Sequence, residues 1–394
     1  MIGFDEALAI LARSVAPLDS EIVPFDQAAG RFLAQDLRAR YDAPRCDVSV
    51  MDGYAVRANS AGQDRPLQLT GESRPGAPFA GSVDESNAVR IFTGAPVPEG
   101  ADIVIMQEYA QASGATVRFS EGWGPARHIR RKGSDFREGE RLLAAGARLT
   151  PQAMVAAAAA DRAELEVARR PRLALIATGD EIVPPGEAHH QPLAQPDTAS
   201  HAVAAIARRI GAELVLHARG RDNRDELSAL AQKALEAADC VVVTGGASVG
   251  DHDHARPMFA ETGMELLFSR IAIKPGKPVW LGKVGMKPVL GLPGNPGSAL
   301  VTARLFLQPL LAALQDGDPM AQIATMPLPL GADLEANGSR ETFFRASATP
   351  QGLVPVSNQV SGAQAVLAKA DWLIRRAPHA PAASAGSLVE ALPL

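Results

Sequence analysis

Apolar residues recur at helical spacing over residues 4–15, which predicts an amphipathic helix at the start of the chain. Residues 39–136 follow a different pattern, because short apolar runs such as Val89–Phe92 and Ile103–Met106 are separated by turns rich in Gly and Pro. Short apolar runs bounded by such turns are typical of strands. This stretch therefore predicts a small β-rich domain. Thr150-Pro151 then begins an Ala-rich helix, with Thr as the cap and Pro at the first helical position.

Strands and helices alternate after Arg170-Pro171. The pattern predicts strands at Leu173–Ala177, Leu214–His217, Cys240–Val243, Leu266–Ile273 and Pro288–Leu292. It predicts helices at 199–210, 225–237, 254–262 and 297–314. Strands interleaved with helices favour right-handed crossovers and a mostly parallel sheet.

The chain is therefore predicted to be a multidomain α/β protein. A helical linking domain of residues 1–38 plus 137–170 would carry an inserted β-rich domain at 39–136. A central, mostly parallel α/β sandwich domain would follow at 171–317, and frequent turns between short apolar runs predict a small C-terminal β domain at 318–394.

Composition narrows the possible functions. The 394 residues are 46% hydrophobic, which allows a sizeable core without disulfides. A net charge of −5 and an aromatic content of 5% argue against a nucleic-acid or anionic-membrane binder. Cys46 and Cys240 lie far apart without a CxxC motif, which excludes a disulfide scaffold and makes a zinc site improbable. The N-terminus lacks a signal-peptide pattern and no apolar run is long enough to span a bilayer, so we expect a cytoplasmic protein.

Three Gly-rich loops follow predicted strands, at Thr178–Glu181, Thr244–Gly250 and Gly291–Ser298. Ligands of open α/β sheets bind at the carboxyl ends of the strands. Glycines allow a phosphate to approach the backbone, and Asn295-Pro296 is expected to cap a helix whose N–H groups suit an anion. Each loop alone is also consistent with an ordinary turn between strand and helix. Two such loops at one sheet edge, beside carboxylates, favour a phosphorylated ligand.

Charged residues cluster near the same predicted edge. Lys274 and Lys277 flank a Pro-Gly turn and would supply positive charge, although they also fit a solvated turn. The carboxylates at or near strand ends are Asp180, Glu181, Asp222, Asp251 and Asp253. Such carboxylates hold Mg²⁺ together with substrate phosphates, and their alternative role is helix capping. His252 and His254 alternate with two of them but lack a third candidate ligand for a metal site.

Two segments of the β-rich region carry charged residues of possible functional interest. The basic stretch Arg127–Arg137 fits either a solvated face or one wall of an anionic pocket. Asp52-Gly53 is predicted to form a hairpin turn.

Motifs in a fixed order extend over almost the whole chain. They are Ser49–Arg57, Thr93–Asp102, Ile129–Asp135, Ala177–Glu181, Gly245–Gly250, Ala272–Pro278 and Gly291–Pro296. With these motifs the sequence resembles the molybdopterin molybdenumtransferases, the family of MoeA and the gephyrin E domain. The resemblance implies four structural domains and a homodimer whose active site lies between domains of two subunits. It also implies insertion of molybdenum from molybdate into adenylylated molybdopterin with release of AMP, a requirement for Mg²⁺, and other cofactor-biosynthesis proteins as partners.

The resemblance also implies roles for individual positions. Catalytic roles would belong to Asp52, Thr93, Asp135, Glu181, Asp222, Asp253 and Lys274, with Glu181, Asp222 and Asp253 as metal ligands. Substrate-binding roles would belong to Thr178, Gly179, Asp180, Gly245, Gly246, Ser248, Gly250, Lys274, Lys277, Pro293, Gly294, Asn295, Pro296, Ser298, Arg340, Arg345 and Ser361. Of these, the lysine turn and Ser298 are linked to molybdate, and Arg340, Arg345 and Ser361 would complete its pocket.

Some positions depart from the family pattern. Ala199 stands where the family usually has Asn, and Gly297 stands where it commonly has Val. The Ala199 change affects a predicted nucleotide or pterin contact. Two alternative functions stay open at this point: a molybdopterin adenylyltransferase, which shares a Thr-Gly-Gly loop, and a non-enzymatic binding or scaffold paralogue.

Overall fold

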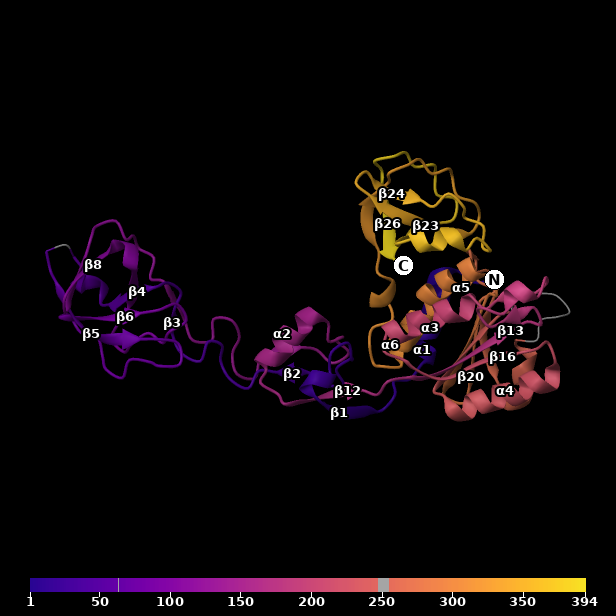
Figure 1. Ribbon diagram of the computed structural model, residues 1–394, viewed down its shortest axis with the longest axis horizontal. Helices are drawn as coiled ribbons and strands as arrows, with labels where there is room; N and C mark the ends of the chain where they lie inside the picture. The colour runs from indigo at the N-terminus through magenta and orange to yellow at the C-terminus, as the bar shows by residue number, and fades with distance from the viewer. Residues whose placement is uncertain (63, 247–254) are drawn as a thin grey trace. The chain divides into compact units, whose positions relative to one another are not determined.

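The computed structural model describes residues 1–62, 64–246 and 255–394. These residues divide into two compact units, one of residues 36–144 and 152–163, the other of residues 1–35, 145–151 and 164–394 (Figure 1). The chain is a multidomain fold of mixed sheets with few helices. In the described part of the chain, no helix combines the length and the apolar character needed to cross a membrane.

The smaller unit is built on a six-stranded sheet in the order β7-β4-β6-β5-β9-β8. Its strands are β4 (Gly53–Val56), β5 (Leu67–Ser73), β6 (Asn87–Ile91), β7 (Ile103–Met106), β8 (Ala110–Ser113) and β9 (Thr116–Phe119). Neighbours are antiparallel except β5 and β6. Alternate side chains of β7 enter different apolar clusters, Ile103 and Ile105 one and Val104 the other, because successive strand residues point to opposite faces.

Shorter elements accompany this sheet. β2 (Leu37–Arg38) pairs with β11 (Arg141–Leu143), and β3 (Val48–Ser49) pairs with β10 (Ile129–Arg130). Helix α2 (Pro151–Ala159) begins at the predicted proline.

The larger unit contains the α/β domain, whose sheet has the order β16-β13-β17-β21-β20-β18. Its strands are β13 (Arg172–Thr178), β16 (Glu213–Gly220), β17 (Cys240–Thr244), β18 (Glu265–Ser269), β20 (Trp280–Val284) and β21 (Lys287–Leu292). Its helices are α1 (Phe4–Ser14), α3 (Ala199–Arg209), α4 (Arg224–Ala237), α5 (Pro296–Thr302) and α6 (Gln308–Ala313). The first four strands in this order are parallel, and β20 and β18 run antiparallel to their neighbours.

Helices cover both faces of this sheet (Figure 1). Leu173 and Leu175 pack in the cluster that contains α1, α3, α5 and α6. Ala174 and Ile176, which alternate with them on β13, pack in the cluster of α4 and residues 257–262. A parallel strand buried on both faces needs a continuous apolar run, which is why these strands were predictable.

The structure corrects three predicted elements. The predicted strand Leu266–Ile273 is divided, because β18 ends at Ser269 and β19 (Ile273–Lys274) pairs with the C-terminal β23 instead. The predicted helix 254–262 is a 3₁₀ helix at Pro257–Thr262, and residue 254 lies outside the described residues. The predicted helix 297–314 contains a π-helical turn at Ala303–Leu307, next to Pro309, which lacks the N–H that a regular helix needs.

The C-terminal sheet of the larger unit joins β19 to β22 (Met326–Pro329), β23 (Glu341–Thr349), β24 (Gly352–Pro355), β25 (Trp372–Arg376) and β26 (Leu388–Pro393). Two smaller pairings complete the unit. β1 (Ser20–Pro24) runs antiparallel to β12 (Glu164–Ala168), and β14 (Ile182–Val183) runs parallel to β15 (Gln195–Pro196).

Candidate functional site

A cavity of about 600 Å³ opens at the carboxyl ends of β13, β17 and β21. This is the edge at which parallel α/β sheets bind ligands. Eleven of the residues predicted to belong to the site line it: Thr178, Gly179, Glu181, Asp222, Gly245, Gly246, Lys277, Pro293, Gly294, Asn295 and Pro296. The structure therefore brings together residues from five separate segments of the chain.

Two of the Gly-rich loops meet closely at this edge. Gly245 has a φ of +95°, and a Cβ there would lie 2.5 Å from the carbonyl oxygen of Thr178. A residue with a side chain would be strained by its backbone and would also push the two loops apart. The glycine thus allows the ends of β13 and β17 to form one continuous wall.

Asn295 lines the cavity at the beginning of α5, but its side chain makes no capping hydrogen bond to that helix. The expectation that it caps α5 is therefore wrong for the side chain. Pro296 does occupy the first helical position, where its missing N–H costs nothing. Within the described ranges, the Asn295 amide is therefore not used by α5 and lies at the cavity wall.

Charged side chains of both signs line the cavity. Glu181 and Lys277 are exposed, and neither forms an ion pair with any other residue that the structure describes. Asp180 is fixed differently, because its Oδ1 accepts the backbone N–H of Asp222 at 3.0 Å. Lys274 is exposed on β19 but does not line the cavity.

The predicted metal ligands are only partly described. Glu181 and Asp222 both line the cavity. Asp253, Ser248 and Gly250 lie outside the described residues, as do Asp251, His252 and His254. Among the described residues, no group of three or more His, Cys, Asp or Glu is arranged to hold a metal ion. Two carboxylates beside a cavity with Gly-rich walls still fit Mg²⁺, which usually binds one or two carboxylates together with substrate phosphates.

Arg345 lies beside the first turn of α5 and is fully buried. Its Nη1 donates to the carbonyl oxygen of Val360 at 3.3 Å, and its Nε donates to Gln359 at 3.2 Å. Its Nη2 has no hydrogen-bond partner among the residues of the described ranges. Burial lowers the pKa of Arg345 from its ordinary value.

The other predicted members of this pocket surround the same turn. The carbonyl oxygen of Ser361 accepts the N–H of Gly297 at 2.9 Å. Ser298 is buried and its carbonyl oxygen accepts the hydroxyl of Thr302 at 2.7 Å. Arg340 donates to the carbonyl oxygen of Ile273 at 3.3 Å. None of Arg340, Arg345, Ser361 and Ser298 lines the cavity itself.

The smaller unit brings Asp52 and Thr93 together. Oδ1 of Asp52 accepts the backbone N–H of Thr93 at 2.7 Å and its hydroxyl at 2.9 Å. These hydrogen bonds hold the pKa of Asp52 below its ordinary value. The predicted hairpin at Asp52-Gly53 is wrong, because β3 pairs with β10 and β4 pairs with β6 and β7. A Cβ on Gly53 would lie 2.0 Å from the carbonyl oxygen of Ile105, so the glycine instead allows β4 to approach β7.

Most of the basic side chains in the stretch Arg127–Arg137 form ion pairs within the same unit. Arg130 pairs with Asp135 at 2.9 Å. Arg131 pairs with Asp47 at 2.5 Å, and Lys132 lies 3.5 Å from Asp42. These ion pairs favour the interpretation of a solvated, internally paired face over that of an open anion-binding wall.

Among the polar residues that line the cavity, sequence reasoning gave no site role to Gln195, Asp197, Thr198, Arg270 and Gln364. Asp197 had a local signal, since an Asp three residues before Ser200 at a helix start is a capping pattern. Arg270 and Gln364 had none, because they reach the cavity from the connection after β18 and from the C-terminal domain.

Comparison with known families covers most of the chain. Residues 2–160 match the MoeA N-terminal region (domain I and II). Residues 174–313 match a probable molybdopterin binding domain, and residues 327–394 match the MoeA C-terminal region (domain IV). The cavity therefore lies mainly within the matched molybdopterin-binding region.

Individual relatives agree with these matches. A molybdopterin molybdenumtransferase of Haemophilus influenzae is 37% identical over 320 residues, covering 80% of this chain and 78% of the relative. One of Synechococcus elongatus is 32% identical over 391 residues, covering 95% of both. The crystal structure of a molybdopterin biosynthesis MoeA protein from Pyrococcus horikoshii superimposes with a TM-score of 0.84 at 25% identity, covering 99% of both chains. This chain therefore belongs to the molybdopterin molybdenumtransferase family.

Proposed function

We propose that this chain transfers molybdenum from molybdate into adenylylated molybdopterin and releases AMP, as a step of molybdenum cofactor biosynthesis. The observation that carries the proposal is the cavity at the carboxyl ends of β13, β17 and β21, within the region that matches a molybdopterin-binding domain. Its Gly-rich walls suit a phosphorylated ligand, and its charged residues suit a reaction in which negative charge moves.

The residues at the cavity have distinct roles in this proposal. The loops containing Thr178 and Gly245 bind the phosphates of the adenylylated substrate. Lys277 attracts the anionic substrates, and Arg345 supplies a second positive charge beside α5. The Nη2 of Arg345, which has no hydrogen-bond partner among the described residues, and the nearby Ser361 support a molybdate pocket at this turn, with Lys274, Ser298 and Arg340 around it.

Glu181 and Asp222 are the described residues that would hold a Mg²⁺ ion, with Asp253 as a third candidate. The ion would neutralise charge on the phosphoanhydride. The chemistry requires no protein nucleophile. A water molecule or a molybdate oxygen can attack the phosphorus atom on the molybdopterin side of the phosphoanhydride, so that its P–O bond to AMP breaks and AMP leaves. The protein contributes positioning and electrostatic stabilisation.

Asp52, Thr93 and Asp135 are proposed to act in the same reaction through a homodimer. The support is the family membership of the chain together with the hydrogen bonds that fix Asp52 against Thr93. Analytical ultracentrifugation of the full chain tests the dimer. Loss of activity in Asp52→Ala with the dimer retained would support a catalytic role for Asp52.

The decisive experiment measures AMP release from adenylylated molybdopterin by the purified protein with Mg²⁺, with and without molybdate. Molybdate-dependent AMP release supports the proposal. ATP consumption with pyrophosphate release would favour an adenylyltransferase instead. Binding without release, or full activity in both Asp52→Ala and Glu181→Ala, would contradict the proposed site.

A further inference from the structure

A chain of three polar side chains lies behind one wall of the cavity. Asp197 precedes α3, Ser200 is in its first turn, and His217 is on the neighbouring strand β16. Ser200 is fully buried, and the Asp197 side chain keeps only 2% of its accessible surface, although Asp197 lines the cavity. None of the roles described above uses these residues.

The hydrogen bonds show which of the three side chains donates and which accepts. The Ser200 hydroxyl lies 2.5 Å from Oδ2 of Asp197 and 2.7 Å from Nε2 of His217. A hydroxyl has one proton to donate and a carboxylate only accepts. Ser200 therefore donates to Asp197 and accepts from the Nε2–H of His217. The order of donation is His217 to Ser200 to Asp197.

Helix capping alone does not account for this arrangement. Oδ1 of Asp197 already accepts the backbone N–H of Ser200 at 3.1 Å, which satisfies a free donor at the beginning of α3. The additional bonds come from a second strand and fix the rotation of the carboxylate. A carboxylate has about four acceptor positions, so Asp197 keeps acceptor capacity beyond the two bonds to Ser200.

The protonation state of His217 does not change its role as hydrogen-bond donor to Ser200. Burial lowers the pKa of His217, and Asp197, 4.0 Å away, opposes this shift. His201, Arg208 and Arg219 also face His217 and favour its neutral form. Both the neutral Nε2–H tautomer and the imidazolium donate through Nε2, so the bond to Ser200 persists in either state.

We propose that the Asp197 carboxylate binds the pterin ring of the substrate by accepting hydrogen bonds from its exocyclic amino group and from the neighbouring ring N–H. In this arrangement Ser200 and His217 are positioning residues for that carboxylate. The inference rests on the proposed function, because that function supplies the pterin. Two parallel N–H donors match a carboxylate in a bidentate pair. Phosphate and molybdate would be repelled by a buried carboxylate. Adenine presents an acceptor next to its amino group and so matches only one carboxylate oxygen.

The position of Asp197 fits this assignment. Thr198 and Ala199 follow it along the same wall, and Ala199 provides no polar side chain where the family usually has Asn. The phosphate-binding loops at Thr178 and Gly245 also line this cavity. A ligand with a heterocycle at Asp197 and phosphates at the glycines would thus use both the acidic and the Gly-rich parts of the wall.

The test compares two small probes by titration calorimetry on the full-length protein. 6-Hydroxymethylpterin carries the amino and N–H edge without phosphate, and AMP carries phosphate and adenine without a pterin. We expect Asp197→Asn to weaken binding of the pterin probe by about 10-fold or more and to leave AMP binding unchanged, because the amide replaces one acceptor by a donor. The matched control is His201→Gln, an exposed neighbour that makes no bond to Ser200.

The positioning residues are tested by conservative rescue. Ser200→Ala and His217→Leu should weaken pterin binding about 3- to 10-fold. His217→Gln, whose amide still donates to Ser200, should bind the pterin probe nearly as well as the unchanged protein. With the complete substrate, Ser200→Ala should raise KM and leave kcat unchanged. A purely structural role would instead lower the unfolding midpoint and affect both probes alike.

Several outcomes would overturn the inference. They are failure of the unchanged protein to bind the pterin probe, equal losses for pterin and AMP, or full pterin affinity in Ser200→Ala. If Asp197→Asn does not fold, binding of the pterin probe by Ser200→Ala, His217→Leu and His217→Gln tests the inference instead. Molybdate-dependent AMP release by the unchanged protein is measured separately. If the unchanged protein releases AMP but the variants bind the pterin probe with full affinity, only the inference is refuted. If the unchanged protein releases no AMP, the proposed function is refuted.

Discussion

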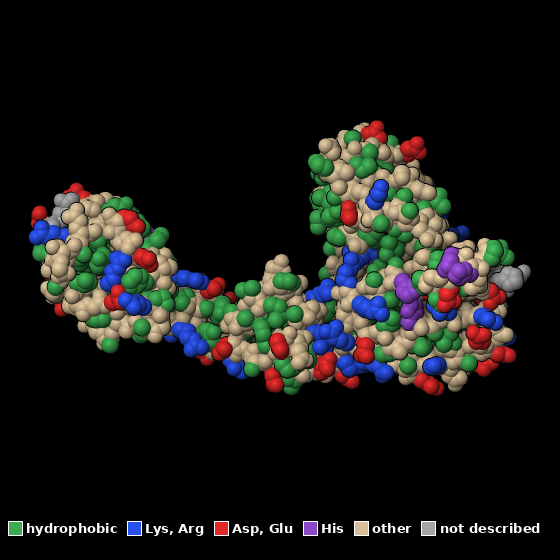
Figure 2. Space-filling view, in the orientation of Figure 1, with side chains coloured by type: hydrophobic (Ala, Val, Ile, Leu, Met, Phe, Trp, Pro, Cys, Tyr) green, Lys and Arg blue, Asp and Glu red, His purple; other side chains and the backbone are tan. Residues whose placement is uncertain are grey.

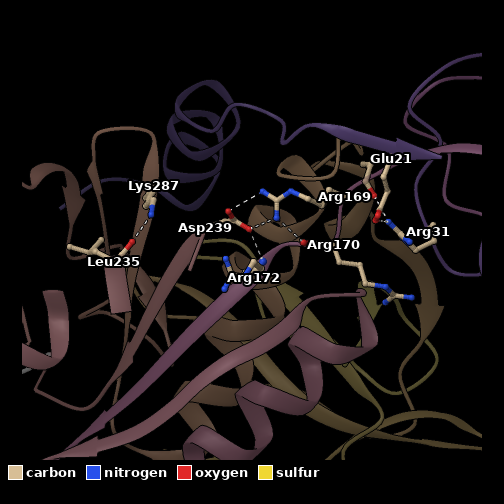
Figure 3. Close-up of polar contacts among 9 residues, drawn as sticks. Glu21, Arg31, Arg169, Arg170, Arg172, Leu235, Asp239 and Lys287 are labelled. Carbon is tan, nitrogen blue, oxygen red and sulfur yellow. Dashed lines mark hydrogen bonds and ion pairs between the residues drawn. The ribbon is translucent and has the colours of Figure 1, made fainter. Parts of the chain in front are cut away.

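The two ends of the sheet in the α/β domain differ in how their charged side chains are paired. At the amino ends of β13 and β17, Asp239 accepts Nη1 and Nη2 of Arg169 at 2.8 and 3.0 Å and the N–H of Arg172 at 2.8 Å (Figure 3). Near this end, Lys287 donates to the carbonyl oxygen of Leu235. The charges there are satisfied by the protein itself.

The carboxyl ends of the same strands carry charges that face a cavity. Glu181 and Lys277 form no ion pair with another residue of the described ranges, and Asp222 lines the same cavity. Leaving charged groups available for a ligand gives up stabilisation that internal pairing would provide. At one end of the sheet the charges are paired within the protein, whereas at the other end charged side chains line the cavity.

The surface of the α/β domain does not by itself reveal this difference. Figure 2 shows Lys, Arg, Asp and Glu side chains interspersed on the visible face of the region around α3 and α4. The pairing of each charge, rather than the number of charges, distinguishes the two ends. Substitutions at matched positions can therefore break or sharpen the comparison.

The largest effect is expected for Glu181→Gln at the cavity. We expect AMP release to fall by about 100-fold or more, because a proposed metal-holding carboxylate loses its charge. The unfolding midpoint should stay unchanged, since Glu181 is exposed and has no ion pair within the described ranges. Steady-state AMP release and thermal unfolding measure the two quantities. Glu187→Gln, at an exposed position after β14 that does not line the cavity, is the control and should retain activity.

The opposite result is expected for Asp239→Asn at the amino ends. Loss of a carboxylate that accepts three hydrogen bonds should lower the free energy of unfolding by about 2 kcal/mol. AMP release per folded molecule should be unaffected, because Asp239 does not line the cavity. Urea unfolding followed by circular dichroism measures the stability. A loss of activity at full stability would contradict the division between the two ends.

Two lysines, Lys277 at the carboxyl ends of the strands and Lys287 at the amino ends, allow the same substitution to be compared at both ends of the sheet. Lys277→Met at the cavity should weaken AMP binding by about 10-fold with little change in stability. Lys287→Met should lower the free energy of unfolding by about 1 kcal/mol and leave AMP affinity intact, because Lys287 bonds to the backbone of α4. Calorimetry and urea unfolding of both variants decide between these results. Equal effects of the two substitutions on AMP affinity would remove the distinction.

The smallest effect is the pH dependence of the Asp239 contribution. Burial tends to raise the pKa of Asp239, but hydrogen bonds from Arg169 and Arg172 outweigh it and lower the pKa below its ordinary value of 3.8. A carboxyl with a lowered pKa in the folded state stabilises above its unfolded pKa and loses this contribution as the pH falls through the folded pKa. The stability difference between the unchanged protein and Asp239→Asn should thus be constant at pH 5–7 and shrink below about pH 4. Unfolding at stepped pH would show a constant difference if the Asp239 interactions were not ionic.

The central strands were predictable because burial on both faces of the sheet leaves continuous apolar runs, as in Leu173–Ala177. The Gly-rich loops were predictable because close approach at Gly245 admits no side chain. The division of Leu266–Ile273 was not predictable, since β19 pairs with a strand of the C-terminal sheet nearly 70 residues later in the chain. Pairing with a distant strand leaves no local periodicity to detect.

The sequence alone determined most of the helices and strands of the α/β domain and its Gly-rich turns, because backbone geometry and apolar periodicity act over a few residues at a time. Its ordered motifs also indicated the family. Only the tertiary structure decided which charges are paired and which face the cavity. Asp239 and Glu181 are both acidic residues beside strands of one sheet, yet Asp239 pairs with Arg169 and Glu181 lines the cavity. The physical reason is that electrostatic pairing depends on distances between side chains from separate elements, such as Asp197 and His217, which packing of the folded chain alone establishes.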